Sequence, residues 1–328
     1  LSSSGFCGKT ALRELPHEGL VYYRVYFESL KTGAFSQQSL GQLTATDLSL
    51  RTPLTFAWSG DVGGQGFGIN PDMGGMTIFE TIREANPDVF IHCGDVVYAD
   101  SVFKTKKKLS DGRIWRNLVT PAKAKVAETI EEFRGQYRYN ALDQNLRKMS
   151  AALPQIVLWD DHETKNNWWP GHQLVADRRY RVKSCNLLSA RARQAFFEHV
   201  PIARRNETPG RIYRKLSQGP LLDIFVTDAR SYRGPNSKGR QRQQGPRTHF
   251  FGPTQLQWLC KSLRESSATW KVIACSQPLS LIISHGAQAY DGWANGASGP
   301  PRGRELEVAH LLNFLQREKV RNVVWLSA

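Results

Sequence analysis

Acidic residues follow three predicted strands of this sequence, each at the point where the strand ends. They are Asp61, Asp95 and the adjacent pair Asp160 and Asp161, with His162 next in the chain. Because the carboxyl ends of strands in an open α/β sheet meet in one crevice, we expect these side chains to share a site. Several carboxylates in one crevice repel one another unless a cation neutralises them. The sequence therefore predicts a metal site.

Each of these residues also has an ordinary structural interpretation when it is taken alone. An Asp at a strand end commonly caps a helix or fixes a turn. His162 stands beside acids and could be a surface salt-bridge partner, and His92 lies inside an apolar run, where packing explains it. The joint order of the motifs favours metal chemistry over these interpretations.

The elements that must position these residues alternate between short apolar runs and helical stretches from residue 54 onward. That alternation is typical of an α/β domain. We predict strands at 54–59, 89–93, 155–159, 222–227, 270–275 and 322–327. We predict helices at 76–84, 124–140, 184–199, 253–262 and 304–318. The segments rich in Gly, Pro and charge are interpreted as long loops, which are commonly functional in a compact domain: 101–120, 230–250 and 284–303.

Residues 20–47 have a different pattern, in which apolar and polar residues alternate on both sides of a turn near Gly33. That pattern predicts a β-hairpin. A hairpin alone is only marginally stable in water, so it must pack on something. We interpret residues 1–50 as the remnant of a small N-terminal β-sandwich of the Fn3/Ig-like type, and residues 51–328 as the α/β domain that carries the site.

Size and charge exclude some classes of protein. The chain has 328 residues, of which 40% are hydrophobic, and no apolar run reaches the roughly 18 to 20 residues that span a bilayer, so we expect no transmembrane segment. The net charge of +15 attracts anions, but charge alone does not choose among nucleic acid, anionic lipid and a phosphorylated small molecule. Because the basic residues are dispersed, we expect no specific nucleic-acid recognition. The five cysteines have no metal-finger spacing.

Several motifs, taken in order, resemble those of the calcineurin-like metallophosphoesterases, and more closely those of the alkaline phosphatase D (PhoD-like) family. The resemblance covers residues 20–328. It rests on Gly94-Asp95-Val96-Val97-Tyr98, Gln136-Tyr137-Arg138, Trp159-Asp160-Asp161-His162-Glu163, Asn166-Asn167-Trp168, Asp228-Ala229-Arg230-Ser231-Tyr232-Arg233, Gly252-Pro253-Thr254-Gln255 and Thr269-Trp270-Lys271.

This resemblance implies a four-layer α/β/β/α metallophosphoesterase sandwich that hydrolyses phosphate esters at a dinuclear centre with a bridging hydroxide. It implies alkaline phosphatase or phosphodiesterase activity on a phosphate-ester small molecule, outside the cytoplasm, in the periplasm or after secretion. Two alternatives stay open. One is a phospholipase D-like phosphodiesterase acting on a phospholipid, and the other is a phosphate or polyanion binder whose centre is incomplete.

The resemblance also implies a set of metal ligands. The run from Gly94 to Tyr98 is similar to the Gly-Asp-x-x-Tyr motif in which a tyrosine oxygen binds ferric iron. Asp61, Asp95 and Tyr98 are therefore implied as ligands of Fe³⁺, a hard ion that suits carboxylate and phenolate oxygens. Asp95 is implied to bridge to a second divalent metal, Ca²⁺, which Asp161 also binds.

The remaining roles concern the substrate. The family resemblance implies that His162 is the hydrogen-bond donor or general acid at a phosphoryl or leaving-group oxygen. Asn167 is a candidate for orienting the substrate, with helix capping an equal alternative. Arg230 and Arg233 are candidates for binding the phosphate group, with a solvated loop as the alternative.

The sequence departs from the superfamily pattern in two places. The usual first motif is Asp-x-His, but no His follows Asp61, and we expect Tyr98 to replace it. The resemblance also predicts an Asp-Val-His motif directly after the strand at 322–327, where the sequence stops at Ala328. We therefore expect the missing ligands to come from a separate C-terminal fragment, or this form to be metal-deficient and inactive.

Overall fold

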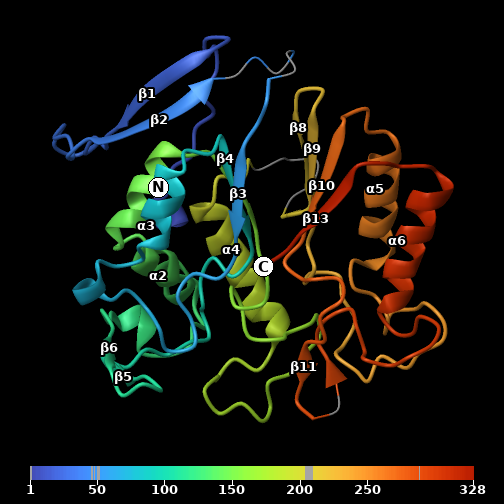
Figure 1. Ribbon diagram of the computed structural model, residues 1–328. Helices are drawn as coiled ribbons and strands as arrows, with labels where there is room; N and C mark the ends of the chain where they lie inside the picture. Colours follow the sequence, from blue (N-terminus) through green and yellow to red (C-terminus); the bar gives the residue numbers. More distant parts are fainter. Residues whose placement is uncertain (1, 46, 48, 50–51, 204–209, 288) are drawn as a thin grey trace.

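Two β-sheets form the centre of the molecule in the computed structural model, which describes residues 2–45, 47, 49, 52–203, 210–287 and 289–328 (Figure 1). The first sheet has the strand order β3-β4-β7, with all strands parallel. The second has the order β13-β10-β9-β8, and only β8 is antiparallel to its neighbour. Their bounds are β3 (Phe56–Ser59), β4 (Val89–Cys93), β7 (Gln155–Leu158), β8 (Arg214–Gln218), β9 (Leu222–Val226), β10 (Trp270–Ala274) and β13 (Val323–Leu326).

Helices cover the outer faces of both sheets (Figure 1). Helices α1 and α3 pack against Phe90 of β4, and α5 and α6 pack against Phe225 and Ile273 of the second sheet. The two sheets face each other through an apolar cluster that includes Ile91 and Ile224. The predicted mixed α/β fold is confirmed. The helices are η1 (Ser2–Ser4), η2 (Pro71–Met73), α1 (Ile78–Glu84), η3 (Pro121–Lys123), α2 (Ile130–Asn140), α3 (Gln144–Ala152), α4 (Cys185–His199), α5 (Gly252–Arg264) and α6 (Glu305–Arg317).

All six predicted strands of the two sheets are confirmed, with ends that shift by one or two residues. Strands β4 and β9 are buried along their whole length. A parallel strand that is covered on both faces has a continuous apolar sequence instead of an alternating one. This is why short apolar runs located these strands reliably.

The predicted helices are also confirmed, but one start is corrected. Helix α2 begins at Ile130 and not at residue 124, because Thr129 and Glu132 form a capping box there. The Glu132 carboxylate accepts a hydrogen bond from Thr129 N at 2.9 Å, and Thr129 Oγ1 accepts one from Glu132 N at 3.3 Å. Helix α3 lies outside the predicted helices. Its cap is Asp143, which accepts a hydrogen bond from Leu146 N at 2.9 Å.

Two of the three predicted loops contain short hairpins, which corrects the prediction that they are loops throughout. Strands β5 (Lys106–Lys108) and β6 (Ile114–Arg116) pair across a turn at Asp111-Gly112, where Gly112 has φ = 88°. An Asp-Gly pair between such runs is a hairpin signal. Strands β11 (Ser284–His285) and β12 (Ala289–Tyr290) pair around Gly286, and residue 288 between them lies outside the described residues.

The predicted N-terminal hairpin is confirmed as β1 (Gly19–Val25) and β2 (Ser39–Ala45). It packs on α3, and Tyr23 Oη donates a hydrogen bond to the Ala151 carbonyl at 3.2 Å. Residue 46, predicted to belong to this hairpin, and the expected domain boundary at residues 50 and 51 lie outside the described residues. Among the helices that the structure describes, none is both long and apolar enough to cross a membrane.

Candidate metal centre

The loops that follow β3, β4 and β7 hold strained backbone conformations. Asp61, Asp95 and Asn167 have φ angles of 62°, 54° and 57°, in the left-handed region that residues other than glycine rarely adopt. Such residues persist only where the surrounding structure holds them, and they cluster at functional sites. All three line the same cavity of about 300 Å³.

Tyr98 connects the first two of these loops. Its hydroxyl donates a hydrogen bond to the Asp61 carboxylate, and its ring stacks on the ring of His162 with 4.0 Å between centroids. A Cβ atom on Gly64 would lie 2.5 Å from the Tyr98 ring, so only glycine allows the ring to sit there. The glycine-rich stretch after β3 therefore makes room for Tyr98.

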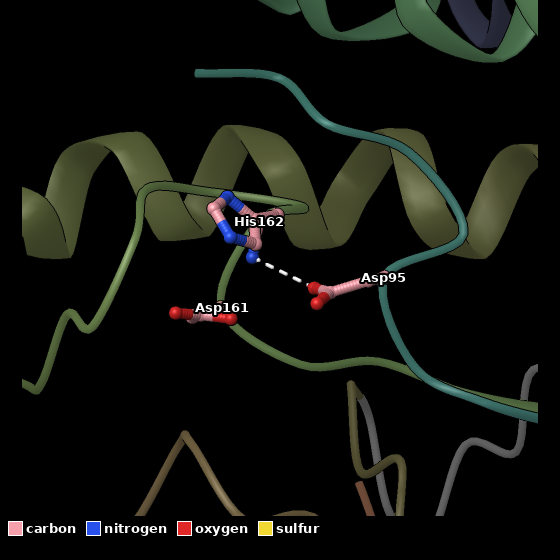
Figure 2. A group of neighbouring side chains, drawn as sticks. All are labelled: Asp95, Asp161 and His162. Carbon is pink, nitrogen blue, oxygen red and sulfur yellow. Dashed lines mark hydrogen bonds between the residues drawn. The ribbon is translucent and has the colours of Figure 1, made fainter. Parts of the chain in front are cut away.

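Asp95, Asp161 and His162 form a compact group of ligand-type side chains (Figure 2). One ligand atom from each lies within 4.8 Å of the others. The backbone N–H of His162 also donates to Asp95 Oδ1 at 3.0 Å, which fixes the loop after β7 against the loop after β4. The group can hold a metal ion, and it includes His162, which the sequence indicated only as a substrate-facing residue.

His162 is oriented by an acid that the sequence did not single out. His162 Nδ1 donates to Asp100 Oδ1 at 2.8 Å, and Asp100 Oδ2 accepts a further hydrogen bond from Asn166 N at 2.7 Å. Burial alone lowers the pKa of His162, but the hydrogen bond to Asp100 and the negative charge of Asp161 raise it to about 9. His162 therefore carries a proton at neutral pH, and its Nε2 is left for another partner.

Negative charge accumulates around Asp95. Burial raises the pKa of its carboxyl group well above the ordinary range, and the nearby charges of Asp161, Asp160 and Glu163 raise it further. Burial also raises the pKa of the Tyr98 phenol, with Asp95 as the next cause. These shifts mark carboxylates whose negative charge the neighbouring residues do not balance, and a bound cation would balance it.

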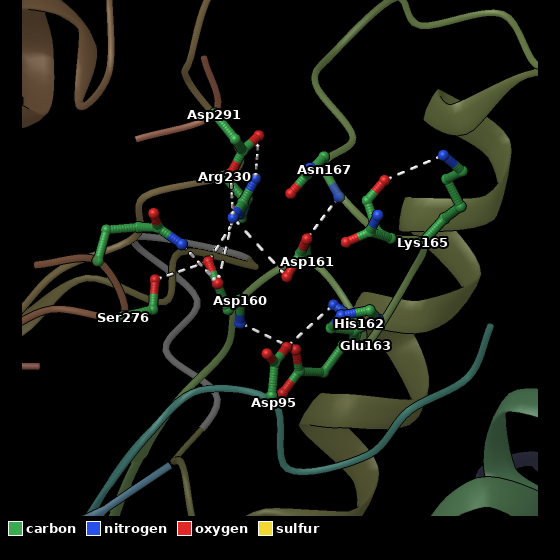
Figure 3. A network of polar contacts seen from close by, with 12 residues as sticks. Asp95, Asp160, Asp161, His162, Glu163, Lys165, Asn167, Arg230, Ser276 and Asp291 are labelled. Atoms are coloured by element: carbon green, nitrogen blue, oxygen red, sulfur yellow. Dashed lines mark hydrogen bonds and ion pairs between the residues drawn. The ribbon is translucent and has the colours of Figure 1, made fainter. Parts of the chain in front are cut away.

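Residues that follow strands of the second sheet form another wall of the cavity, where Arg230 and Asp291 meet acids and Asn167 from the loop after β7 (Figure 3). Arg230 follows β9 and donates from Nε to Asp160 Oδ1 at 2.6 Å and from Nη1 to Asp291 Oδ1 at 3.1 Å. With its amide nitrogen facing the acids, Asn167 donates to Asp161 Oδ2 at 3.2 Å and to Asp291 Oδ2 at 3.3 Å. This wall links the two sheets through buried hydrogen bonds.

The structure brings together most of the predicted site residues. The cavity wall contains Asp61, Asp95, Tyr98, Asp161, His162, Asn167 and Arg230. Arg233 is not part of that wall. Its guanidinium is buried behind Asp291, with Nη2 at 3.2 Å from Asp291 Oδ1. Any effect of Arg233 on a substrate would pass through Asp291.

Glu163, the last residue of the Trp-Asp-Asp-His-Glu motif, holds the loops in place. Its carboxylate accepts hydrogen bonds from Val96 N at 2.7 Å and from Asp160 N at 2.8 Å. Burial raises the pKa of Glu163 to about 8, although these hydrogen bonds oppose the shift. Glu163 thereby ties the loop after β4 to the loop after β7.

Comparison with known proteins agrees with this architecture. A model of the PhoD-like phosphatase family matches residues 56–328. The chain belongs to this family. It is 28% identical to alkaline phosphatase D of Bacillus subtilis (strain 168) in an alignment of 268 positions that covers 77% of this chain and 43% of that protein. A solved structure described as "Structure of PhoD" shares the fold, with a TM-score of 0.69 at 22% identity over 93% of this chain and 56% of that one.

The family resemblance inferred from the motifs is thus confirmed, and with it the expectation that the chain is homologous to a phosphatase. The chain spans about half the length of these relatives, at 43% and 56%. The matched segment contains every element of the two central sheets. It therefore includes all the loops that form the cavity.

Sequence reasoning missed four residues that line the cavity or hold its side chains in place: Asp100, Ser276, Gln277 and Asp291. Asp100 had a signal, because it lies two residues after the end of the motif from Gly94 to Tyr98. Ser276 and Gln277 lie two and three residues after the end of β10, where the strand-end rule that located the acids would also have found them. Asp291 had no such signal, because it follows the short strand β12 in a segment interpreted as a loop.

Proposed function

We propose that this chain carries the centre of a metal-dependent hydrolase of phosphate esters, with alkaline phosphatase or phosphodiesterase activity. One observation carries the proposal. The ligand atoms of Asp95, Asp161 and His162 lie within 4.8 Å of one another at the cavity of a chain that belongs to a phosphatase family. Bacillus subtilis alkaline phosphatase D, a relative at 28% identity, is named for the same class of reaction.

The residues of the cavity fit a pair of hard metal ions. The site offers carboxylate oxygens and one phenol, and the raised pKa of buried Asp95 marks negative charge that lacks a partner. We propose that Asp61, Asp95 and Tyr98 hold Fe³⁺, and that Asp95 and Asp161 hold a second ion, Ca²⁺. Bound there, the metals would supply positive charge for the phosphoryl oxygens and lower the pKa of a water that attacks phosphorus.

His162 is the proposed proton donor of the reaction. Asp100 accepts from Nδ1 and fixes the plane of the ring, so Nε2 can donate to a phosphoryl or leaving-group oxygen. The hydrogen bond to Asp100 also raises the pKa of His162 and so favours the protonated ring that a proton donor needs.

Asn167, from the loop after β7, and Arg230, which follows β9, are the proposed substrate-facing groups. Asn167 holds a left-handed backbone at the cavity, and its side-chain amide lies between Asp161 and Asp291. Arg230 faces the same space, but its donors point at carboxylates, so it contributes positive charge instead of a free fork. Arg233 supports Asp291 from behind and completes the proposed set.

Turnover of model esters tests the proposal. The chain is supplied with Fe³⁺ and Ca²⁺ and given nitrophenyl phosphate and bis-nitrophenyl phosphate, beside an Asp161→Asn variant. We expect turnover by the wild-type chain that falls sharply in the variant. If neither ester is hydrolysed although metal is bound, the chain is a phosphate or polyanion binder.

A phospholipase D-like activity is the second candidate, and one observation favours it. Pro278, Leu281 and Ile283 form an apolar part of the cavity wall, and Leu281 is 62% exposed. An acyl or other apolar group on a phosphodiester would cover that surface. A phosphatidylcholine vesicle assay beside the nitrophenyl esters ranks the two candidates.

The identity of the first metal has its own test. An iron-tyrosinate site absorbs visible light, and Tyr98 is the phenol that lines the cavity beside Asp61. We expect a coloured protein with iron bound, and we expect Tyr98→Phe to lose the band. A colourless iron-loaded protein would rule out the tyrosinate.

The family also guides three wider proposals. We propose that the layered fold is the superfamily's α/β/β/α sandwich and that β1 and β2 belong to an N-terminal β-sandwich domain. We propose an extracytoplasmic location. We further propose that residues following β13 complete the ligand set, because Ala328, just after that strand, lies in the cavity wall.

A further inference from the structure

Arg230 joins the two sheets at the candidate centre. Its side chain is 1% exposed and lies between two carboxylates, Asp160 from the first sheet's side and Asp291 from the second (Figure 3). Nε and Nη2 donate to the two oxygens of Asp160 at 2.6 and 3.1 Å. On the other side, Nη1 donates to Asp291 Oδ1 at 3.1 Å, and Nη2 lies 2.8 Å from Asp291 Oδ2. The guanidinium therefore has a forked partner on each side.

Each carboxylate oxygen of Asp160 accepts one hydrogen bond from Arg230 and one from another side chain. Ser276 Oγ donates to Asp160 Oδ1 at 2.7 Å, and Gln277 Nε2 donates to Asp160 Oδ2 at 2.8 Å. Both residues follow β10, so Asp160 binds the ends of two strands of the second sheet. Asp160 is not one of the grouped ligand residues, although its neighbour Asp161 is.

Asp161 lies within reach of the same guanidinium. Its Oδ1 is 3.7 Å from Arg230 Nη2, beyond the distance of a good charge-assisted hydrogen bond. Asp161 Oδ2 accepts a hydrogen bond from the Asn167 backbone. If Arg230 moved closer, it would neutralise Asp161 and compete with a metal ion for this carboxylate.

We propose that Asp160 and Asp291 are positioning residues that engage Arg230 and so keep Asp161 available to a metal ion. This inference rests on the proposed metal centre, in which Asp161 is a ligand. Loss of one partner would leave a buried guanidinium short of counter-charge, which is strongly unfavourable. The next carboxylate in its path is Asp161, at 3.7 Å.

Three variants of the full chain test this role. Asp160→Asn removes the charge that engages Arg230 but keeps the shape of the side chain. The double variant Asp160→Asn/Arg230→Gln also removes the competing cation, and it has no unpaired arginine at this position to disturb folding. Asp223→Asn is the matched control, because Asp223 is a buried acid at the opposite end of β9 that pairs with Lys215 at 2.6 Å.

Calcium binding measured by calorimetry, with Ca²⁺ as the only added metal, is the first readout. We expect Asp160→Asn to bind Ca²⁺ about 10- to 100-fold more weakly than the wild type, the usual cost of losing an outer partner of a metal ligand. We expect the double variant to recover most of that loss and Asp223→Asn to bind as the wild type does. If Asp160 has only a structural role, the double variant will bind Ca²⁺ as weakly as Asp160→Asn does. That result would overturn the proposal.

A crystal structure of Asp160→Asn is the second readout, and it needs no metal. We expect a nitrogen of Arg230 to move to within about 3 Å of Asp161. If Arg230 stays where it is, the proposal fails even when Ca²⁺ binding is weakened. If the wild type binds no Ca²⁺ at all, the metal centre is wrong, while the position of Arg230 still decides the role of Asp160.

Discussion

Two buried aspartates in one cavity, Asp95 and Asp291, have pKa values that shift in opposite directions. Burial raises the pKa of Asp95, and other acids add to the shift. Burial also acts to raise the pKa of Asp291, but Arg230 and Arg233 outweigh it and hold that pKa well below its ordinary value. Asp95 on the first sheet's side thus has acids as its charged neighbours, whereas Asp291 on the second sheet's side has Arg230 and Arg233 beside it. A buried carboxylate without a cationic neighbour is available to a metal ion, whereas one that is paired with arginine holds the surrounding structure together.

The largest expected effect comes from Asp95→Asn. We expect kcat on nitrophenyl phosphate to fall by about 10³-fold, because the change removes the charge of a proposed metal ligand. We also expect the metal-free protein to become more stable, since one member of the repelling group is gone.

The matched control is Asp88→Asn, an exposed acid at the opposite end of β4. It should leave kcat near the wild-type value. Thermal melts in a chelator give the stability, and a loss of metal-free stability in Asp95→Asn would contradict the comparison.

Asp291→Asn should destabilise the protein, which is the opposite of the stability change expected for Asp95→Asn. Asp291 is fully buried, and its loss leaves Arg230 and Arg233 short of counter-charge. We expect the free energy of unfolding to drop by roughly 3 kcal/mol with or without metal. Urea unfolding measures it, and an unchanged midpoint would show that the arginines find other partners.

Asp100 refines the comparison. It is an acid on the first sheet's side, but it also has a cation beside it, the protonated ring of His162. Burial opposes the shift, but the hydrogen bond from His162 lowers the pKa of Asp100. We expect Asp100→Asn to reduce kcat by about 10²-fold, since His162 loses its orientation.

The pH profile identifies the role of Asp100. Without this acid the pKa of His162 falls, so the alkaline limb of the profile should move to lower pH. A profile that keeps its shape while kcat drops would assign Asp100 a purely structural role.

The smallest expected effect is the pH dependence of stability in a chelator. Burial raises the pKa of Glu163 from 4.5 to about 8, so between these values the folded state binds more protons than the unfolded state. His162, whose pKa is raised from 6.5 to about 9, loses its stabilising contribution as pH rises through that range. The raised pKa values of both groups predict that stability falls as the pH rises from about 5 to about 9. Melting temperatures that rise over this range would contradict the shifts.

The sequence located the strands and the strand-end acids well, and the reasons are local. Strands β4 and β9 are apolar throughout, and the positions of Asp61, Asp95 and Asp161 follow from where their strands end. Helix α3 and the two small hairpins were less visible. Helix α3 is separated from α2 by three residues, and the hairpins are short and lie in segments dominated by Gly and charge.

The residues that surround the proposed metal ligands could not be predicted from the sequence in the same way. Asp100 lies two residues after a known motif, but its partner His162 is 62 residues away in the chain. Arg233 was predicted to face the substrate, and the structure places it behind Asp291 instead. Hydrogen bonds across such separations depend on how loops from different strands meet.

The sequence by itself determined which residues reach the carboxyl ends of the strands, because strand length and apolar pattern set that position. Only the tertiary structure decided what the adjacent residues Asp160 and Asp161 do. Successive side chains point in different directions, so Asp160 meets Arg230 from the second sheet, while Asp161 faces the cavity with Asp95 and His162. The partner that separates their roles lies 70 residues away in the chain, and folding alone brings it there.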